Sequence, residues 1–343
     1  MKLKITILAL SCFSLSYAQI PPGSPLNHPA VQKRLFNQAS TTASNIMLAN
    51  YFTNFIEMRT ISDRTSKIRN DIVDTGFYAR IYGGKLEPRS LKQFSNFSID
   101  YYSGQFGYDT TIHQANGTHI IMGAELGYLY GDNHYKYANG DSQSFNASVY
   151  SALFTDDHYY LEGFLKYSHI RNSYKFHDPL TKQLLKNNSK SNNQMMLSLE
   201  TGKRWYLHKA HHGWYIEPQL QFTYSNIEKT HFRGPYNLEL TSQQIKLPLL
   251  RAGLMAGYNF EHGNGFYNIY ARFNYIRNFK SEIDFAFNNI TTRYSIKKHW
   301  CDYNVGSNMT FNRQHSFVAE IGTANGNCFK EDLNLSLAYR YSF

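Results

Sequence analysis

The sequence has little of what a helical membrane protein or a cofactor-dependent enzyme would need. Only 17% of its 343 residues are charged, and it contains three cysteines and nine prolines. Beyond the first residues no run of about 18 apolar residues occurs, and the mean hydropathy is −0.50, which excludes a bundle of membrane-spanning helices. There is no glycine-rich phosphate loop and no nucleic-acid motif, so we expect neither a cofactor nor a nucleic-acid partner.

Aromatic residues and glycine are abundant instead. The chain contains 28 Tyr, 24 Phe and 22 Gly, and its formal net charge is +10. A β-barrel keeps its membrane signal hidden from hydropathy averages because its strands alternate apolar and polar residues, and its rims are lined with aromatic side chains. We therefore interpret the basic charge as a surface that faces anionic lipid, including lipopolysaccharide, rather than nucleic acid.

The last eleven residues have the pattern of a membrane strand. From Leu333 to Phe343 apolar or aromatic residues alternate without interruption with small or polar ones, so that one face is apolar and the other is polar. A soluble β-sandwich strand could alternate in the same way. The aromatic residues that end at Phe343 favour a strand whose rim lies in the membrane interface, and we expect the barrel-assembly machinery to engage this strand.

The first 18 residues have the pattern of a secretory signal. Lys2 and Lys4 precede an apolar run that ends near Leu15, and a small-x-small sequence predicts cleavage at about Ala18/Gln19. Cys12 lies within this run, and the sequence before it fits lipoprotein processing poorly. We expect an extended proline-rich segment at residues 19–30 and an outer-membrane location in a diderm bacterium.

Residues 31–70 form a third region, without any glycine or proline. Apolar residues recur at helical spacing among Ser, Thr, Asn and basic residues, which predicts one helix of about 30–40 residues or two helices with a break. A helix of 30 residues is about 45 Å long, enough to cross a bilayer inside a protein lumen. An ordinary surface helix is the alternative.

The rest of the chain, residues 71–343, reads as about twelve strands, an even number as expected for a bacterial barrel. Short connectors are expected at 156–158, 208–213, 261–265 and 313–315, and generally longer ones at 131–141, 172–190, 228–241, 282–298 and 325–331. Short periplasmic turns and longer outer loops are typical of such barrels. Counting back from Phe343 places the short turns in the periplasm.

Several motifs, in this order, resemble the β-barrel translocator domain of autotransporters, the type V secretion proteins. The similarity runs from about residue 63 to Phe343, and it rests on Gly76–Gly84 (GFYARIYGG), Gly104–Asp109 (GQFGYD), Tyr160–Gly163 (YLEG), Glu200–Arg204 (ETGKR), Trp214–Gln219 (WYIEPQ), Arg251–Gly253 (RAG) and Arg340–Phe343 (RYSF). Tyr78 and Lys203 replace residues that are usual in the family. The resemblance implies an all-β fold, a twelve-stranded antiparallel transmembrane β-barrel with an N-terminal α-helix in the lumen.

Charged residues on membrane strands are tolerated where they face a polar interior. The residues expected in this lumen are Arg80, Glu162, Glu200, Arg204, Glu217, Gln219 and Arg251. The helix offers Glu57, Arg59, Asp63, Arg64, Lys67 and Arg69 as partners. We interpret these groups as structural, because buried charges often are, and a direct role in moving cargo is the alternative.

The sequence does not predict an enzyme. Asp156, Asp157 and His158 could activate water, but their turn is on the expected periplasmic side, whereas barrel proteases cleave at the outer rim. His208, His211 and His212 could bind a metal, but they lack well-spaced cysteine or carboxylate partners, so no metal site is expected.

No repeats typical of a large passenger precede the helix. We expect a non-enzymatic, autotransporter-like barrel that works as a translocator-type pore without a large passenger and has a structural or secretion-related role. A porin-like channel and an outer-membrane hydrolase are the alternatives.

Two cysteines follow the signal, Cys301 and Cys328. If Arg313 and Gln314 form the centre of a turn, residues whose numbers sum to about 627 face each other, so Cys301 faces position 326. Cys328 is then two residues further along the chain, within reach of a diagonal pair. We expect a disulfide between them, because secreted proteins fold in an oxidising compartment.

Overall fold

The computed structural model describes residues 29–68, 75–89, 97–115, 117–177, 184–188, 191–207, 212–233, 239–280, 282–287, 290–295, 299–327 and 329–343. The expected signal at residues 1–18 and nearly all of the proline-rich segment lie outside these ranges. The first described element is a single unbroken helix, α1 (Pro29–Ile68), of 40 residues. Pro29 suits the first helical position because its missing N–H would have no partner there. The helical part of the described chain contains no stretch apolar enough to cross a bilayer on its own.

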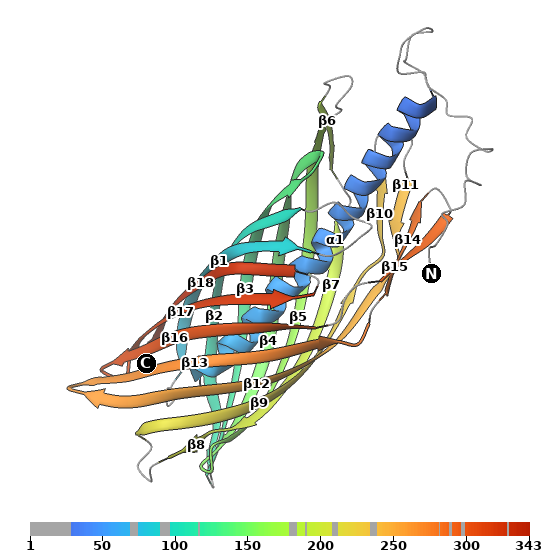
Figure 1. Ribbon diagram of the computed structural model, residues 1–343. Coiled ribbons are helices and arrows are strands. Elements are labelled where there is room, and N and C mark those ends of the chain that lie inside the picture. Colours follow the sequence, from blue (N-terminus) through green and yellow to red (C-terminus); the bar gives the residue numbers. More distant parts are fainter. Residues whose placement is uncertain are drawn as a thin grey trace.

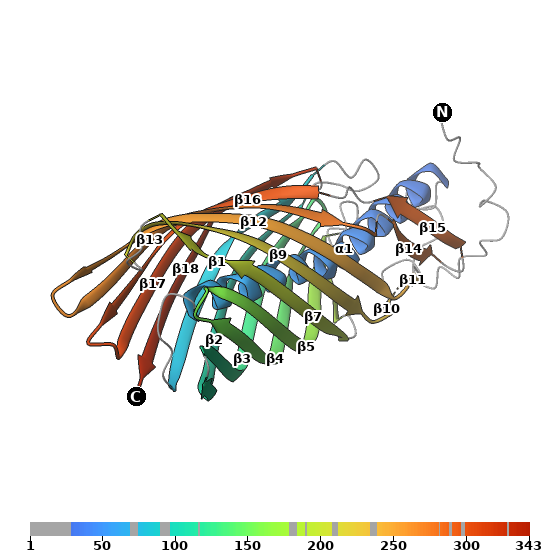
Figure 2. The same cartoon turned by 90° about the horizontal axis from the view of Figure 1, so that it is seen from below.

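Twelve long strands, counted over the described ranges, form a closed antiparallel barrel around the inner half of α1 (Figures 1 and 2). They are β1 (Gly76–Pro88), β2 (Ser98–Ala115), β3 (Thr118–Tyr135), β4 (Ala138–Thr155), β5 (Tyr159–His177), β7 (Asn192–Lys203), β9 (Gly213–Ile227), β12 (Ile245–His262), β13 (Gly265–Asn278), β16 (His299–Phe311), β17 (His315–Gly326) and β18 (Phe329–Ser342). The first and last strands pair from Gly76↔Ser342 to Pro88↔Phe329, which closes the ring and leaves no edge in the lipid. The twelve-stranded barrel and the lumen helix are therefore confirmed.

The two ends of the barrel differ. We call the end that carries Phe343 and the turns after β4, β12 and β16 the inner end, and the opposite end the outer end. At the inner end Asp156–His158 joins β4 to β5, and two residues, Gly263 and Asn264, join β12 to β13. Short turns of this kind are typically periplasmic in bacterial barrels, and the two names follow the orientation expected from the sequence.

The prediction of long outer loops was wrong in one respect, because much of this sequence continues the strands. A two-residue turn, Lys136–Tyr137, joins β3 to β4 where a longer connector was expected. β6 (Leu184–Asn188) extends the sheet beside β5. The other short strands are β8 (Trp205–Tyr206), β10 (Thr230–Arg233), β11 (Glu239–Ser242), β14 (Glu282–Phe287) and β15 (Ile290–Ser295).

β10, β11, β14 and β15 form a separate four-stranded sheet at the outer end, beside the emerging helix (Figure 1). Its buried Leu240, Ile283 and Phe285 belong to the same core as the helix. On its exposed side Arg293 donates a 2.8 Å hydrogen bond to Asp284 across β14 and β15, which lowers the pKa of that carboxyl. These four strands, which we call the outer sheet, therefore pack against the helix beyond the end of the barrel.

The faces of the strands are chemically opposite. Outward positions carry exposed Leu, Ile, Val, Phe and Tyr, whereas inward positions are buried and are largely Ser, Asn, Gln, Glu, Arg and Tyr. In β18 the residues predicted to face outward, from Leu333 to Phe343, are all well exposed. Before them a β-bulge places Asp332 and Leu333 opposite the single residue Lys85, so the inward side switches from odd to even numbers.

Five inward tyrosines each lie over a glycine of the neighbouring strand. The cross-strand pairs are Tyr78 with Gly107, Tyr150 with Gly123, Tyr160 with Gly202, Tyr215 with Gly257 and Tyr270 with Gly306. A side chain at any of these glycines would overlap the tyrosine ring. Because the glycine leaves this space, the ring lies flat on the wall, and four of the five phenols donate to a lumen carboxylate.

We predict that Gly123→Ala destabilises the folded barrel by about 1–3 kcal/mol, because the added methyl group would push the Tyr150 ring off the wall. It would also disturb the 2.8 Å hydrogen bond from Tyr150 to Asp109. Urea unfolding, followed by the gel mobility of the folded band, measures the change. Gly104→Ala is the matched control, because a Cβ at Gly104 meets open space. Equal losses in the two variants would contradict the steric argument.

Candidate functional site: helix and lumen

The helix is buried over about 30 Å. Nearly every residue from Gln38 to Met58 is buried, by the barrel and by the outer sheet together, and 20 residues of α-helix rise about 30 Å. Buried Thr42 and Thr53 donate to the carbonyl oxygens four residues earlier, at 2.9 Å each. These hydroxyls therefore need no partner on the barrel wall.

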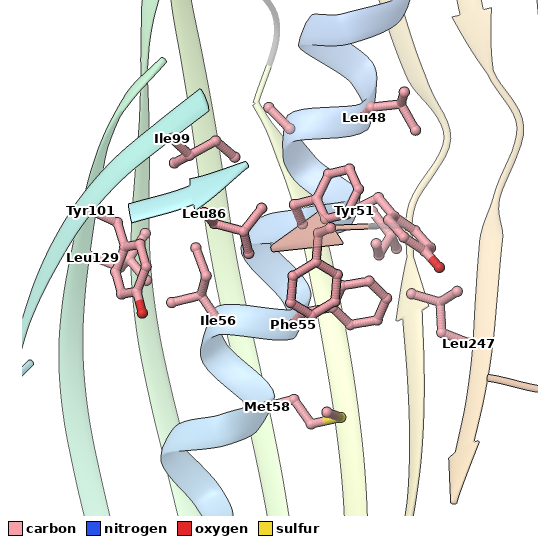
Figure 3. Close-up of a cluster of buried hydrophobic side chains, with 14 of the residues drawn as sticks. Leu48, Tyr51, Phe55, Ile56, Met58, Leu86, Ile99, Tyr101, Leu129 and Leu247 are labelled. Carbon is pink, nitrogen blue, oxygen red and sulfur yellow. The ribbon is translucent and has the colours of Figure 1, made fainter. Parts of the chain in front are cut away.

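Aromatic side chains hold the helix near the outer end (Figure 3). We call Phe97, Trp300 and Phe329, which lie at the outer ends of β2, β16 and β18, the aromatic collar. Phe52 lies 6.1 Å from both Phe97 and Phe329, and Phe55 lies 4.8 Å from Trp300 and 5.9 Å from Phe329, centroid to centroid. Such contacts stabilise the helix in the barrel through the apolar area they bury and through the geometry of the rings. They do not fix one rotation or one depth of the helix strictly.

Glu57 makes a more specific contact, on the inner-end side of the collar. Its carboxylate is fully buried and accepts hydrogen bonds from Ser144 of β4 and from Ser168 of β5, the latter at 2.6 Å. The ammonium group of Lys166, also fully buried, lies 3.9 Å from Glu57 Oε2. A buried carboxylate needs this kind of compensation, because removing it from water without partners costs several kcal/mol.

Arg59 makes the second charged contact of the helix. Its guanidinium donates to Glu331 of β18, and it lies 3.9 Å from Asp302 of β16. Glu331 is the residue before the bulge in β18, and it also accepts from Tyr101 and, at 3.0 Å, from Asn334. The helix is thus tied to the barrel wall beside the seam between the first and last strands.

Two neutral side chains complete the set of helix contacts. Asn172 of β5 donates to Asn50 at 2.6 Å, and Asn278 of β13 donates to the Tyr51 hydroxyl at 2.9 Å. Asn50 and Glu57 lie on the same face of the helix and are both held by β5, whereas Tyr51 contacts β13 and Arg59 contacts β16 and β18. Rotation or translation of the helix would break several of these bonds together.

Ion pairs between strands line the rest of the lumen. Arg204 pairs with Glu217 at 2.7 Å, and Arg251 pairs with Glu200 at 2.8 Å across the intervening β9. Arg251 also donates to Gln219, Gln221 and Asn274 at 2.6–2.9 Å. The structure therefore brings four of the charged lumen residues named from the sequence into two buried pairs.

The rest of that set lies partly within and partly outside the described residues. Arg80 is buried, donates to Ser336 at 3.0 Å and lies 4.9 Å from the centroid of Tyr82, and Glu162 is buried in the wall of β5. The side chain of Arg64 and all of Arg69 lie outside the described part of the chain.

Sequence reasoning missed several lumen groups that prove equally well paired. Arg272 pairs with Glu320 at 2.9 Å, and Arg340 pairs with Asp109 at 2.6 Å. Glu125, which accepts from Tyr78 and Gln105, and Lys166 complete this group. All lie on the inward side of their strands, so counting every second residue from each inward neighbour would have identified them.

The described residues among those weighed as enzyme or metal sites lie at the inner end. Asp156 and His158 belong to the β4–β5 turn, where the Asp156 amide donates to the Gly117 carbonyl at 2.9 Å. His212 lies 3.8 Å from Glu261, whereas His208 and His211 are outside the described ranges. Within the residues that the structure describes, no group of three or more His, Cys, Asp or Glu side chains could hold a metal ion.

Closed antiparallel strands with an apolar outer face and a charged lumen filled by a helix define an outer-membrane translocator-type β-barrel. Residues 77–322 match the family model described as Autotransporter beta-domain, and the chain belongs to this family. It is 29% identical over 307 residues to "Probable autotransporter YcgV" of Escherichia coli K12, an alignment that covers 89% of this chain and 32% of YcgV. The chain thus spans about a third of the length of this relative.

Solved structures agree on the fold. The transport unit of the autotransporter AIDA-I from Escherichia coli superposes with a TM-score of 0.68 at 13% identity, covering 90% of this chain and 99% of that one. The β-domain of the Bordetella autotransporter BrkA gives 0.65 at 21% identity, covering 79% and 100%. The Escherichia coli serine protease EspC is 26% identical over 196 residues, 57% of this chain and 14% of EspC.

We predict that Glu57→Leu destabilises the barrel by about 3–5 kcal/mol, because it leaves the buried ammonium of Lys166 without its counter-charge. The thermal midpoint of the folded band on a gel measures this loss. Replacing both partners, Glu57→Leu with Lys166→Met, should restore most of the stability.

The control for this prediction is Asp332→Asn, which breaks the exposed pair with Lys330 and should cost at most about 1 kcal/mol. If Glu57→Leu cost no more than this surface variant, the carboxylate would not anchor the helix.

The disulfide stays a prediction, because Cys328 lies outside the described residues. The register around it differs by one from the expected one, since Cys301 faces Asn325 and Trp300 faces Gly326. We expect reductant to change the gel mobility of the purified protein and thiol titration to find no free cysteine after signal removal. Unchanged mobility together with two free thiols would exclude the bridge.

Proposed function

We propose that this barrel is a non-enzymatic translocator that carries to the cell surface, and anchors there, the segment of chain joined to the N-terminus of α1. The observation that supports the proposal most directly is the path of the helix. α1 runs through the lumen and leaves it at the outer end beside β10, β11, β14 and β15 (Figure 1). A segment that precedes such a helix emerges on the side of the outer sheet.

The resting state we propose is a filled pore. Glu57 and Arg59 fix the depth of the helix through charged contacts, and the aromatic collar closes around Phe52 and Phe55. Polar and charged contacts specify geometry better than apolar ones, because a small displacement leaves a buried charge unpaired. The helix therefore works as a plug and as the tether of whatever lies ahead of it.

Assembly of this barrel, in our proposal, starts from its last strand. Phe343 directly follows β18, its amide donates to the Thr75 carbonyl at 2.9 Å, and its ring lies 5.8 Å from Phe77 of β1. A C-terminal strand of this kind can pair with the assembly machinery before β1 replaces that partner. The outward aromatic residues around it suit the membrane interface.

The test uses an epitope tag placed immediately before Pro29 in the full chain, expressed with its own signal. Intact cells should bind antibody to the tag, and added protease should remove the tag while leaving the barrel folded. Gly104→Ala, which meets open space, serves as the neutral variant. A tag that is protected in intact cells and becomes accessible only after the outer membrane is opened would contradict the proposed function.

A second measurement tests the plug. Deleting residues 31–70 should enlarge the single-channel conductance of the purified barrel, because the lumen then holds water and ions where the helix was. The full chain should give small or rare openings. If the deletion left conductance unchanged, the helix would not obstruct the pore, and an open porin-like channel would become the better interpretation.

A further inference from the structure

Charged side chains gather on the outer rim of the barrel, which the proposed function does not require. At the outer ends of β2, β3 and β4, Asp100 faces Asp132 and Asp132 faces Asp141 directly across the strands, and His134 lies 3.1 Å from Asp100 and 3.7 Å from Asp132. On another part of the rim, at the outer ends of β12, β13 and β16, the outward charges are positive. There Arg277 faces His299, and Lys246 lies exposed on β12.

We call Tyr275, Arg277 and Phe279 of the β13 segment together with His299 of β16 the rim patch. The Arg277 guanidinium lies 5.6 Å from the Phe279 ring centroid. Tyr275, two residues nearer the inner end of β13, stacks on His299 with 6.0 Å between the ring centroids. All four side chains are exposed on the outer surface of the barrel. The cation is thus framed by aromatic groups that suit the boundary between lipid and water.

The position of the rim patch corresponds to the lipid headgroups. Ten residues separate Arg277 from the inner aromatic residue Tyr267 on β13, which is about 34 Å along a strand. With a strand tilt of about 40° the height is about 26 Å, close to the roughly 25 Å apolar band of such barrels. The outward residues between them include Ile269 and Phe273, both exposed. Arg277 therefore lies at the limit of the apolar surface band that is nearer the outer end.

The charge of Arg277 is not compensated within the part of the chain that the structure describes. The nearest carboxylates further along the chain, Glu282 and Asp284, pair with Arg293 at 3.4 and 2.8 Å. Among the described residues no carboxylate forms an ion pair with Arg277. An exposed arginine with five donors, at headgroup level and without an ion pair to any described carboxylate, is suited to an anionic phosphate.

We propose that the rim patch binds a phosphate group of lipid A, the anionic lipid of the outer leaflet. Lys246 lies further toward the outer end on the neighbouring β12, four residues beyond Leu250, which faces Arg277. The guanidinium would donate to the phosphate oxygens, and so would Nδ1–H of His299, whose Nε2 accepts from Asn327 at 2.7 Å. Tyr275 and Phe279 would contact the adjoining sugar and acyl region. We call Asp100, Asp132 and Asp141 the acidic sector, and we expect their carboxylates to make phosphate binding weaker there than at the rim patch. The inference rests on the outer-membrane orientation of the proposed function.

The experiment measures binding of bisphosphorylated lipid A to the purified, folded full-length barrel in detergent by native mass spectrometry. Arg277→Gln should weaken binding about fivefold, and the double variant with Lys246→Gln about 25-fold, since each basic residue near an anionic surface contributes a factor of about five. Arg277→Lys should retain most of the affinity, and dephosphorylated lipid A should bind all these proteins equally weakly.

The matched control is Arg171→Gln, which removes an exposed, outward-facing arginine at the outer end of β5, next to the acidic sector. Its affinity should stay within about twofold of the wild type. Equal losses in Arg171→Gln and Arg277→Gln, or equal binding of dephosphorylated lipid A by the wild type, would overturn the proposal. Equal binding of phosphatidylglycerol with the same dependence on Arg277 would overturn the choice of lipid A.

This measurement needs a folded barrel and no secretion, so it separates the two proposals. A failed surface-tag assay with intact Arg277-dependent binding would count against the translocator role alone. A surface-exposed tag with no effect of Arg277→Gln would count against the lipid site alone. Unchanged heat-dependent gel mobility of each variant verifies that the barrel is folded.

Discussion

The pairing of buried charges across the lumen is the constraint on which the rest of this structure depends. Each strand faces lipid on one side, so its ionisable groups must point inward, where a helix excludes most of the water. An inward carboxylate then needs a donor, and the barrel supplies one from a neighbouring or second-neighbour strand, as in Arg251–Glu200, Arg272–Glu320 and Arg340–Asp109. These pairs link strands beyond the backbone ladder and stiffen the wall around the helix.

The tyrosine–glycine pairs belong to the same solution. A phenol long enough to reach a carboxylate must lie flat on the wall, and a flat ring needs a neighbour without a side chain. Tyr150 over Gly123 reaches Asp109, which also pairs with Arg340, so one carboxylate receives donors from two directions. Four of these tyrosine–glycine pairs thus serve the lumen charges directly, since their phenols donate to lumen carboxylates.

Much of the architecture could be predicted, because alternation with period two tells which side of each strand meets lipid. Leu333 to Phe343 showed this directly, and strand parity placed Arg204, Glu217, Glu200 and Arg251 on one surface.

The pairings of β11 with β14 could not be predicted, since they join segments more than 40 residues apart whose turn-rich sequence has no clear period. The bulge at Asp332–Leu333 was hidden for a related reason: both residues suit a strand, and only the pairing with Lys85 shows the extra one.

The partners of the helix could be anticipated as a class but not individually. A helix of known charge in a lumen of known charge still has two unknowns, its depth and its rotation, and both depend on packing that has no sequence signature. The aromatic collar resists sliding only weakly, because apolar contacts exchange partners at little cost. Glu57 and Arg59 resist it strongly, since a shift of one turn, about 5.4 Å, would leave Lys166 and Glu331 buried without their counter-charges. The ion pairs of Glu57 and Arg59 with the barrel therefore set one resting depth. The apolar contacts of the collar, and threonine hydroxyls that bond only to the helix backbone, would oppose entry of the helix into the pore much less.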